Sequence, residues 1–166
     1  MSDRSLIGLE KLVTEGGANP ESVAGELAKF FGVRRQEVGL LEIRGELLKF
    51  LLPVQLRTAG SIPLSSYSIA ARTVRTRKAE VFNTFAQIKH SRLFEFVPLE
   101  EPQVIQKLMS APVLDSEGNP LGVLQISRKG YDLPSAGPDF TKDDLEDLRL
   151  AADVVAKLMP GLLAAT

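Results

Sequence analysis

Two β-rich runs joined by a short turn place the strongest constraint on how this chain folds. Residues 108–114 (LMSAPVL) and 121–127 (LGVLQIS) flank the sequence DSEGN at 115–119. Asp, Ser and Asn side chains bond to nearby backbone groups and Gly tolerates positive φ, so the middle sequence favours a tight turn. The whole stretch predicts a β-hairpin. Apolar residues stand at both odd and even positions of 121–126, which is typical of a central strand covered on both faces. We therefore expect a sheet built outward from this hairpin.

The rest of the chain predicts further strands and four helices. Two more strands are expected over 37–43 and 46–52, with Gly45 in the tight turn between them. Apolar residues at helical spacing predict helices over 5–14, 20–31, 66–76 and 141–159. The first of these helices should bury one face, made of Leu6, Leu9, Leu12 and Val13.

Capping residues predict where these helices begin and end. The expected N-caps are Asn19, either Ser66 or Ser68, and Thr141. Gly32 is expected to end the second helix. The sequence Pro160-Gly161 is expected to interrupt the last helix and to leave a poorly protected apolar tail, which contains Leu162 and Leu163.

Three segments resemble the GAF family, a small-molecule-sensing domain of signalling proteins. They are SAPVLDSEGNPLGVLQISRK at 110–129, IPLSSYSIAARTVRTRKAEVFN at 62–83 and FTKDDLEDLRLAADVVAKLM at 140–159. The resemblance extends over about residues 31–159. It implies an α+β, GAF-like (profilin/PAS-like) fold, in which a central antiparallel sheet flanked by helices forms three layers, α/β/α. It also implies a domain over 33–166, preceded by a helical segment, 1–32, that packs on the domain or on a dimer partner.

The resemblance further implies a ligand pocket above one face of the sheet. The helix over 66–76 and the segment 84–102 would cover the pocket, while the terminal helices pack on the other face. Ser68 and Ala71 stand where the family usually has glycines near the start of the covering helix. Arg72 is the candidate partner of an anionic ligand group, and strand register decides whether Gln125 faces the pocket. The implied ligand-binding residues are Tyr67, Ile69, Arg72, Phe82, Asn83, Phe94, Phe96, Met109, Ala111 and Gln125.

The side chains that carry chemistry predict a protein that is not an enzyme. The chain has no cysteine, so disulfides, thiolate catalysis and Cys-based metal sites are excluded. GAF relatives that reduce free methionine sulfoxide, or that attach a bilin covalently, use cysteine, and the Asn-Lys-x-Phe-Asp pattern of cyclic-nucleotide relatives does not occur here. The one histidine, His90, is a poor basis for a metal site or a catalytic triad. We expect no catalytic residue, no metal and no cofactor.

A basic run, Arg72, Arg75, Arg77 and Lys78, permits two interpretations. It could bind an anionic ligand near a helix N-terminus, or it could be a solvated helix face, which is the favoured interpretation. Nucleic-acid binding through 72–78 is a weaker hypothesis, because the net charge of the chain is only −1.

The leading hypothesis is a sensory or regulatory domain that binds an unknown small molecule and signals through helix packing. Its output would go to a separate effector protein or to a homodimer formed through the terminal helices. The alternative is a purely structural dimerisation module, in which Phe82, Phe94, Phe96 and Met109 fill the pocket. No apolar run approaches the ~20 residues of a membrane span, and the N-terminus lacks the apolar core of a signal peptide. We therefore expect a cytoplasmic, bacterial-type protein.

Overall fold

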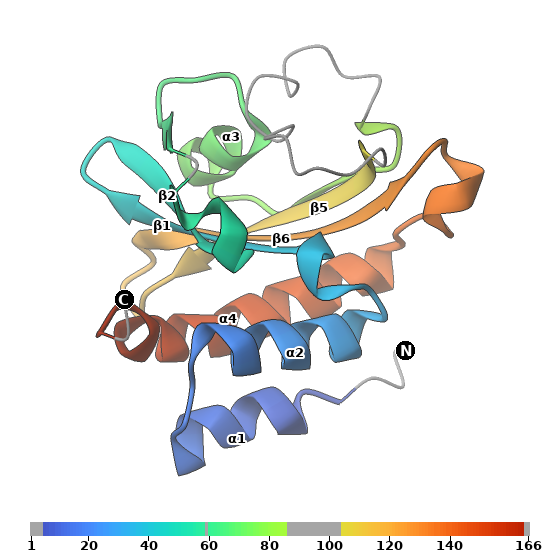
Figure 1. Cartoon of the computed structure of the whole chain (residues 1–166). Coiled ribbons are helices and arrows are strands. Elements are labelled where there is room, and N and C mark those ends of the chain that lie inside the picture. The colour runs from blue at the N-terminus through green and yellow to red at the C-terminus, as the bar shows by residue number, and fades with distance from the viewer. Residues whose placement is uncertain (1–4, 59, 86–103, 165–166) are drawn as a thin grey trace.

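The computed structural model describes residues 5–58, 60–85 and 104–164, apart from the side chains of 163 and 164. The fold is built around one antiparallel sheet (Figure 1). In the described part of the chain the sheet has six strands in the order β3-β2-β1-β6-β5-β4. The strands are β1 (Val38–Arg44), β2 (Leu47–Leu52), β3 (Ser61–Pro63), β4 (Glu80–Phe82), β5 (Val104–Leu114) and β6 (Pro120–Gly130).

The β5–β6 hairpin confirms the prediction made for 108–127. One carboxylate oxygen of Asp115, Oδ1, accepts hydrogen bonds from the backbone N–H groups of Glu117 and Asn119, both at 2.9 Å. Gly118 has φ +84°, which glycine adopts without steric cost. Strand β6 lies between β1 and β5, so its two edges are both paired and it is the central strand that the apolar pattern predicts.

The helices form layers on both faces of the sheet, which confirms the expected α+β GAF-like architecture (Figure 1). Helices α2 and α4 lie on one face, and α1 packs outside them and contacts both. Helix α3 lies on the opposite face. The helices are α1 (Ile7–Glu15), α2 (Pro20–Phe31), α3 (Ile69–Thr76) and α4 (Lys142–Ala164).

Side-chain caps fix the ends of α2 and α3. Asn19 Oδ1 accepts from the backbone N–H of Ser22 at 2.8 Å, and Gly32 ends α2 in the left-handed conformation. Ser68, rather than Ser66, is the N-cap of α3, because its hydroxyl accepts from the N–H of Ala71 at 3.1 Å. The side chains of Asn19 and Ser68 each satisfy a backbone donor that the helix itself leaves unpaired.

Helix α4 does not end at Pro160, so the expectation of an interruption there is wrong. Thr141 and Asp144 begin the helix with reciprocal side-chain to backbone hydrogen bonds of 3.1 and 2.8 Å. The helix then continues through Pro160 to Ala164. Leu162 is 1% exposed, so the packing of this last turn compensates for the hydrogen bond that proline cannot make. Leu162 of the apolar tail is therefore shielded from solvent within a single copy of the protein.

The main core lies between the sheet and helices α1, α2 and α4. Leu9 of α1 is buried there, with Leu6 and Leu12 packed against the same cluster. Val13 was expected to share that face but is 38% exposed, because α1 uses only a narrow stripe against α2 and α4. Across the described residues, no helix is long and apolar enough to cross a membrane.

A matched pair of leucines on α4 tests this packing. Leu148 is 0% exposed, whereas Leu150, half a turn away, is 47% exposed. We expect Leu148→Ala to lower the free energy of unfolding by about 2–5 kcal/mol, because it leaves a cavity in the main core. The control, Leu150→Ala, should change it by only about 0.5 kcal/mol. Urea denaturation followed by circular dichroism measures both, and equal losses would contradict the assigned orientation of α4.

Candidate functional site

A small cavity lies on the face of the sheet that carries α3. Its volume is about 50 Å3. The floor comes from β1, β5 and β6, and the sides come from β2 and from two short 3-10 helices, η1 (Arg35–Glu37) and η2 (Val54–Thr58). The described lining residues are Gln36, Glu37, Val38, Gly39, Phe50, Pro53, Leu56, Ile105, Leu108, Gln125, Ser127 and Lys129.

Strand pairing creates the floor of this cavity. Gln125 of β6 pairs with Gly39 of β1 on one side and with Ser110 of β5 on the other. Gly39 carries no side chain, so the space above its backbone stays open. A Cβ atom built on Gly39 would meet Gln125 Cβ at 3.6 Å, which is ordinary van der Waals contact. Larger side chains at this position would extend toward Gln125.

Buried polar side chains distinguish this face of the sheet. Ser110, Thr73 and Ser127 are buried, and Gln125 is only 7% exposed. Thr73 Oγ1 lies 2.7 Å from Ser110 Oγ, and Gln125 Nε2 donates to Ser110 Oγ at 3.2 Å. This hydrogen-bond network joins α3, β5 and β6, and it stabilises their packing because the two buried hydroxyls in it are both paired.

A buried carboxylate, that of Glu37, forms one wall of the cavity. Its Oε1 accepts from the backbone N–H of Arg34 at 2.8 Å, and its Oε2 accepts from the backbone N–H of Lys129 at 2.7 Å. The guanidinium of Arg34 also pairs with Oε1, at 3.2 Å. These contacts offset the cost of burying a charge. They also anchor η1 to the end of β6.

The sequence comparison identifies the family to which this fold and cavity belong. A sequence model of the GAF domain matches residues 21–159, which is most of the chain. The chain belongs to the GAF family. A search of proteins with curated descriptions finds no significant match.

Solved structures with the same fold come from different kinds of GAF protein. The GAF domain of an Acinetobacter phosphoenolpyruvate-protein phosphotransferase is 16% identical, covers 100% of this chain and 98% of its own, and has a TM-score of 0.68. Free methionine-R-sulfoxide reductase from Neisseria meningitidis is 18% identical, with coverages of 95% and 87% and a TM-score of 0.63. The GAF domain of a Bacillus halodurans sensor histidine kinase is 18% identical, with coverages of 76% and 84% and a TM-score of 0.53.

These neighbours establish the fold and include a GAF domain of a sensor histidine kinase and an enzyme, the methionine-R-sulfoxide reductase. The GAF fold alone therefore assigns neither a catalytic nor a non-catalytic role. This GAF domain has no cysteine. In its described residues, no cluster of three His, Cys, Asp or Glu side chains could hold a metal ion.

Three of the residues expected at the pocket lie on the α3 face of this GAF domain. Gln125 lines the cavity. Ile69 and Phe82 belong to an adjoining apolar cluster, in which Ile69, Phe85 and Leu108 are buried. Of these, Leu108 also lines the cavity, so the cluster borders the site directly.

Met109 and Ala111 lie on the opposite face, so their expected orientation is corrected. Both are buried in the main core with α4. Successive side chains of a strand point to opposite faces, so the residues that face α3 are Leu108 and Ser110. The sequence showed the strand but could not fix which alternate set faced which layer.

Asn83 does not face the cavity either, because it joins β4 to the start of α4. Its Nδ2 donates to the carbonyl of Phe140 at 3.0 Å, and its Oδ1 accepts from the N–H of the same residue at 2.8 Å. The side-chain amide thus pairs with a backbone peptide much as a neighbouring strand would. This is a structural role that the resemblance did not suggest.

The two expected residues nearest the start of α3 are also outside the cavity. Tyr67 is 71% exposed. Arg72 forms two hydrogen bonds with Glu80, at 2.7 and 3.0 Å, and this pairing raises the pKa of Arg72. Arg75 donates to the carbonyls of Leu64 and Ser66 instead. These two arginines are thus paired with a carboxylate and with backbone carbonyls of the chain itself, which favours the solvated-face interpretation over an anion site.

Some expected features lie outside the described residues. They are Phe94, Phe96, His90 and most of the segment 84–102 that was expected to cover the pocket. Sequence reasoning also missed much of the cavity wall, including Glu37, Gly39 and Leu56. No local pattern identifies these three, because they come together only through the packing of η1, η2 and β6.

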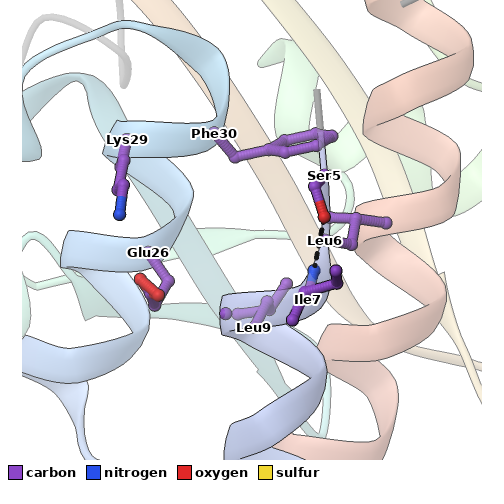
Figure 2. A pocket seen from close by; sticks show the side chains of 8 residues that line it. Ser5, Leu6, Ile7, Leu9, Glu26, Lys29 and Phe30 are labelled. Atoms are coloured by element: carbon purple, nitrogen blue, oxygen red, sulfur yellow. Dashed lines mark hydrogen bonds between the residues drawn. The ribbon is translucent and has the colours of Figure 1, made fainter. Parts of the chain in front are cut away.

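A larger pocket, of about 360 Å3, lies between α1 and α2 on the outside of the molecule. Figure 2 shows Phe30 beside the start of α1, and Glu26 and Lys29 on the facing side of α2. Its lining includes Ile7, which is 61% exposed, and no buried polar side chain among the residues described there. We therefore place the candidate site at the smaller cavity with the polar floor.

Substitution of Asn83 tests its structural role. Asn83→Ala should lower the free energy of unfolding by about 1–2 kcal/mol, because the backbone groups of Phe140 lose two partners. Asn83→Asp should also destabilise, since a carboxylate keeps the acceptor but brings negative charge toward a carbonyl oxygen. Urea denaturation measures the change, and wild-type stability of both variants would refute the proposed role.

Proposed function

We propose that this chain is a non-catalytic sensory or regulatory GAF domain that binds a small molecule in the cavity on the α3 face. Its membership of the GAF family supports this proposal, as does the likeness to the GAF domain of a sensor histidine kinase. The lack of cysteine in the chain argues against a thiol-based reaction at this site.

The observation that carries the proposal is the contrast between the two faces of the sheet. The face toward α2 and α4 presents apolar side chains, including Met109, Leu124 and Ile126. The middle of the α3 face instead buries Ser110 and Gln125 beside a cavity. Burying hydroxyl and amide groups carries a desolvation cost that an apolar core avoids. Polar groups that converge on a cavity are typical of a ligand site.

The size of the cavity limits the ligand. Drug-sized ligands occupy pockets of roughly 300–1,000 Å3, whereas this cavity measures about 50 Å3. That volume holds a few water molecules, since one water needs at least ~10–15 Å3. The ligand we propose therefore has only a few non-hydrogen atoms.

Signalling would use the packing of helices on the sheet. Helix α3 contacts β5 and β6 on the ligand side, and α4 contacts the same two strands on the opposite side. A ligand that binds better to one arrangement of these layers shifts the population toward that arrangement. The output would pass to a separate effector protein or to a second copy of the chain.

A ligand screen by thermal shift tests this function. A true ligand at a hundredfold excess over its Kd should stabilise the wild-type chain by about 2.7 kcal/mol. The variant Gly39→Val should not respond, because its side chain enters the cavity, whereas the smaller change Gly39→Ala should preserve part of the response. Valine is favourable in a strand, so the variant should fold. A ligand that stabilises Gly39→Val as strongly as the wild type would bind elsewhere and contradict the proposed site.

A second candidate function, structural homodimerisation, is favoured by the small cavity volume and by apolar side chains exposed on α1. Ile7 is 61% exposed and lies on the first turn of that helix. On this hypothesis, sedimentation velocity at two protein concentrations should show a dimer that dissociates on dilution. Ile7→Glu should shift the chain to monomer, while the matched change Leu47→Glu, on strand β2, should not. A monomer at every concentration would exclude this function.

A further inference from the structure

The hydrogen bonds between α3 and the cavity run in one direction. Thr73 Oγ1 lies 2.9 Å from the carbonyl oxygen of Ile69. A carbonyl oxygen only accepts, so the single hydroxyl proton of Thr73 is donated to Ile69. Thr73 Oγ1 can then only accept in its 2.7 Å contact with Ser110 Oγ. The hydroxyl proton of Ser110 is therefore donated to Thr73.

This direction fixes the orientation of the amide of Gln125. Ser110 Oγ has used its proton, so it can only accept a hydrogen bond from Gln125. The amide nitrogen, Nε2, must therefore face Ser110, at the observed 3.2 Å. Amide nitrogen and oxygen are distinguished by such networks, and here the network permits one assignment.

The amide oxygen of Gln125 consequently faces the cavity. Ser110 and Gly39 flank Gln125 on opposite sides, on β5 and β1 respectively. The oxygen Oε1 lies 3.9 Å from the position that a Cβ on Gly39 would occupy, and Gly39 lines the cavity. Among the described residues, no hydrogen bond to this oxygen is present. Gln125 as a whole is 7% exposed and lines the cavity, so this oxygen is an acceptor that borders the open space.

We infer that the cavity selects a small ligand that donates an N–H or O–H to Gln125 Oε1, over a molecule of the same shape that can only accept. This inference rests on the proposed function and adds the chemical class of the ligand. The carboxylate of Glu37, which also lines the cavity, is a second acceptor, although Arg34 and Lys129 already donate to it. A ligand without a donor would leave Oε1 desolvated and unpaired, which carries a cost.

Acetamide and acetone test the inference, because they have the same planar shape and differ in one amide NH2 group. The wild-type chain would be titrated with each compound and followed by amide NMR chemical shifts at Gly39, Leu108 and Gln125. We expect acetamide to bind about fivefold more tightly than acetone, as one net hydrogen bond allows.

Two variants show whether the hydrogen-bond chain sets this preference. Ser110→Ala removes the acceptor that holds Nε2, so the amide of Gln125 can turn and the preference should fall to within about twofold. The matched control is Ser127→Ala. This change also removes a hydroxyl from the cavity wall, but Ser127 takes no part in the hydrogen bonds that link Thr73, Ser110 and Gln125. It should keep the preference, since Ser127 donates instead to the backbone carbonyl of Glu37.

The outcomes separate this inference from the proposed function. Equal binding of the two compounds to the wild-type chain would overturn the donor selectivity and leave a ligand cavity standing. An unchanged acetamide preference in Ser110→Ala would overturn the role of the Thr73–Ser110–Gln125 chain. Binding of neither compound at these residues would overturn the proposed ligand site, and the inference with it.

Discussion

The pairing of β6 with β1 and β5 determines what each layer of the molecule can do. Because side chains alternate along a strand, one register sends Leu124 and Ile126 to the helical core and Val123 and Gln125 to the α3 face. A shift by one residue would bury the amide among the helices and expose leucine above the cavity. The stability of the core and the chemistry of the cavity therefore depend on the same set of backbone hydrogen bonds.

The α3 face combines apolar and polar packing in separate places. Beside the cavity, Ile69, Phe85 and Leu108 form a buried apolar cluster. Thr73, from the same helix as Ile69, instead supplies a hydroxyl to the sheet. The apolar contacts hold α3 on the sheet, and the hydroxyl contact specifies its position, since a satisfied buried network has few alternative geometries.

Much of the fold could be predicted from local sequence, whereas most of the site could not. The Asp115–Asn119 turn and the Asn19 cap form through neighbouring residues, so the sequence specifies them directly. The orientation of Met109 and Ala111 depends on which face of the β5–β6 hairpin packs against α4, and α4 is distant from β5 in the chain. The role of Asn83 depends on Phe140, which follows it by 57 residues. The interruption expected at Pro160 failed because tertiary packing around Leu162 outweighs a local preference.

The sheet ends in two short strands, since β3 and β4 have three residues each. Beyond the Ser110–Glu80 pair, the outer edge of β5 has no strand partner among the described residues, and Pro112 stands in that stretch without an N–H group. Short edges and an edge proline give an approaching strand little to bond with. The edges thus disfavour strand-by-strand aggregation.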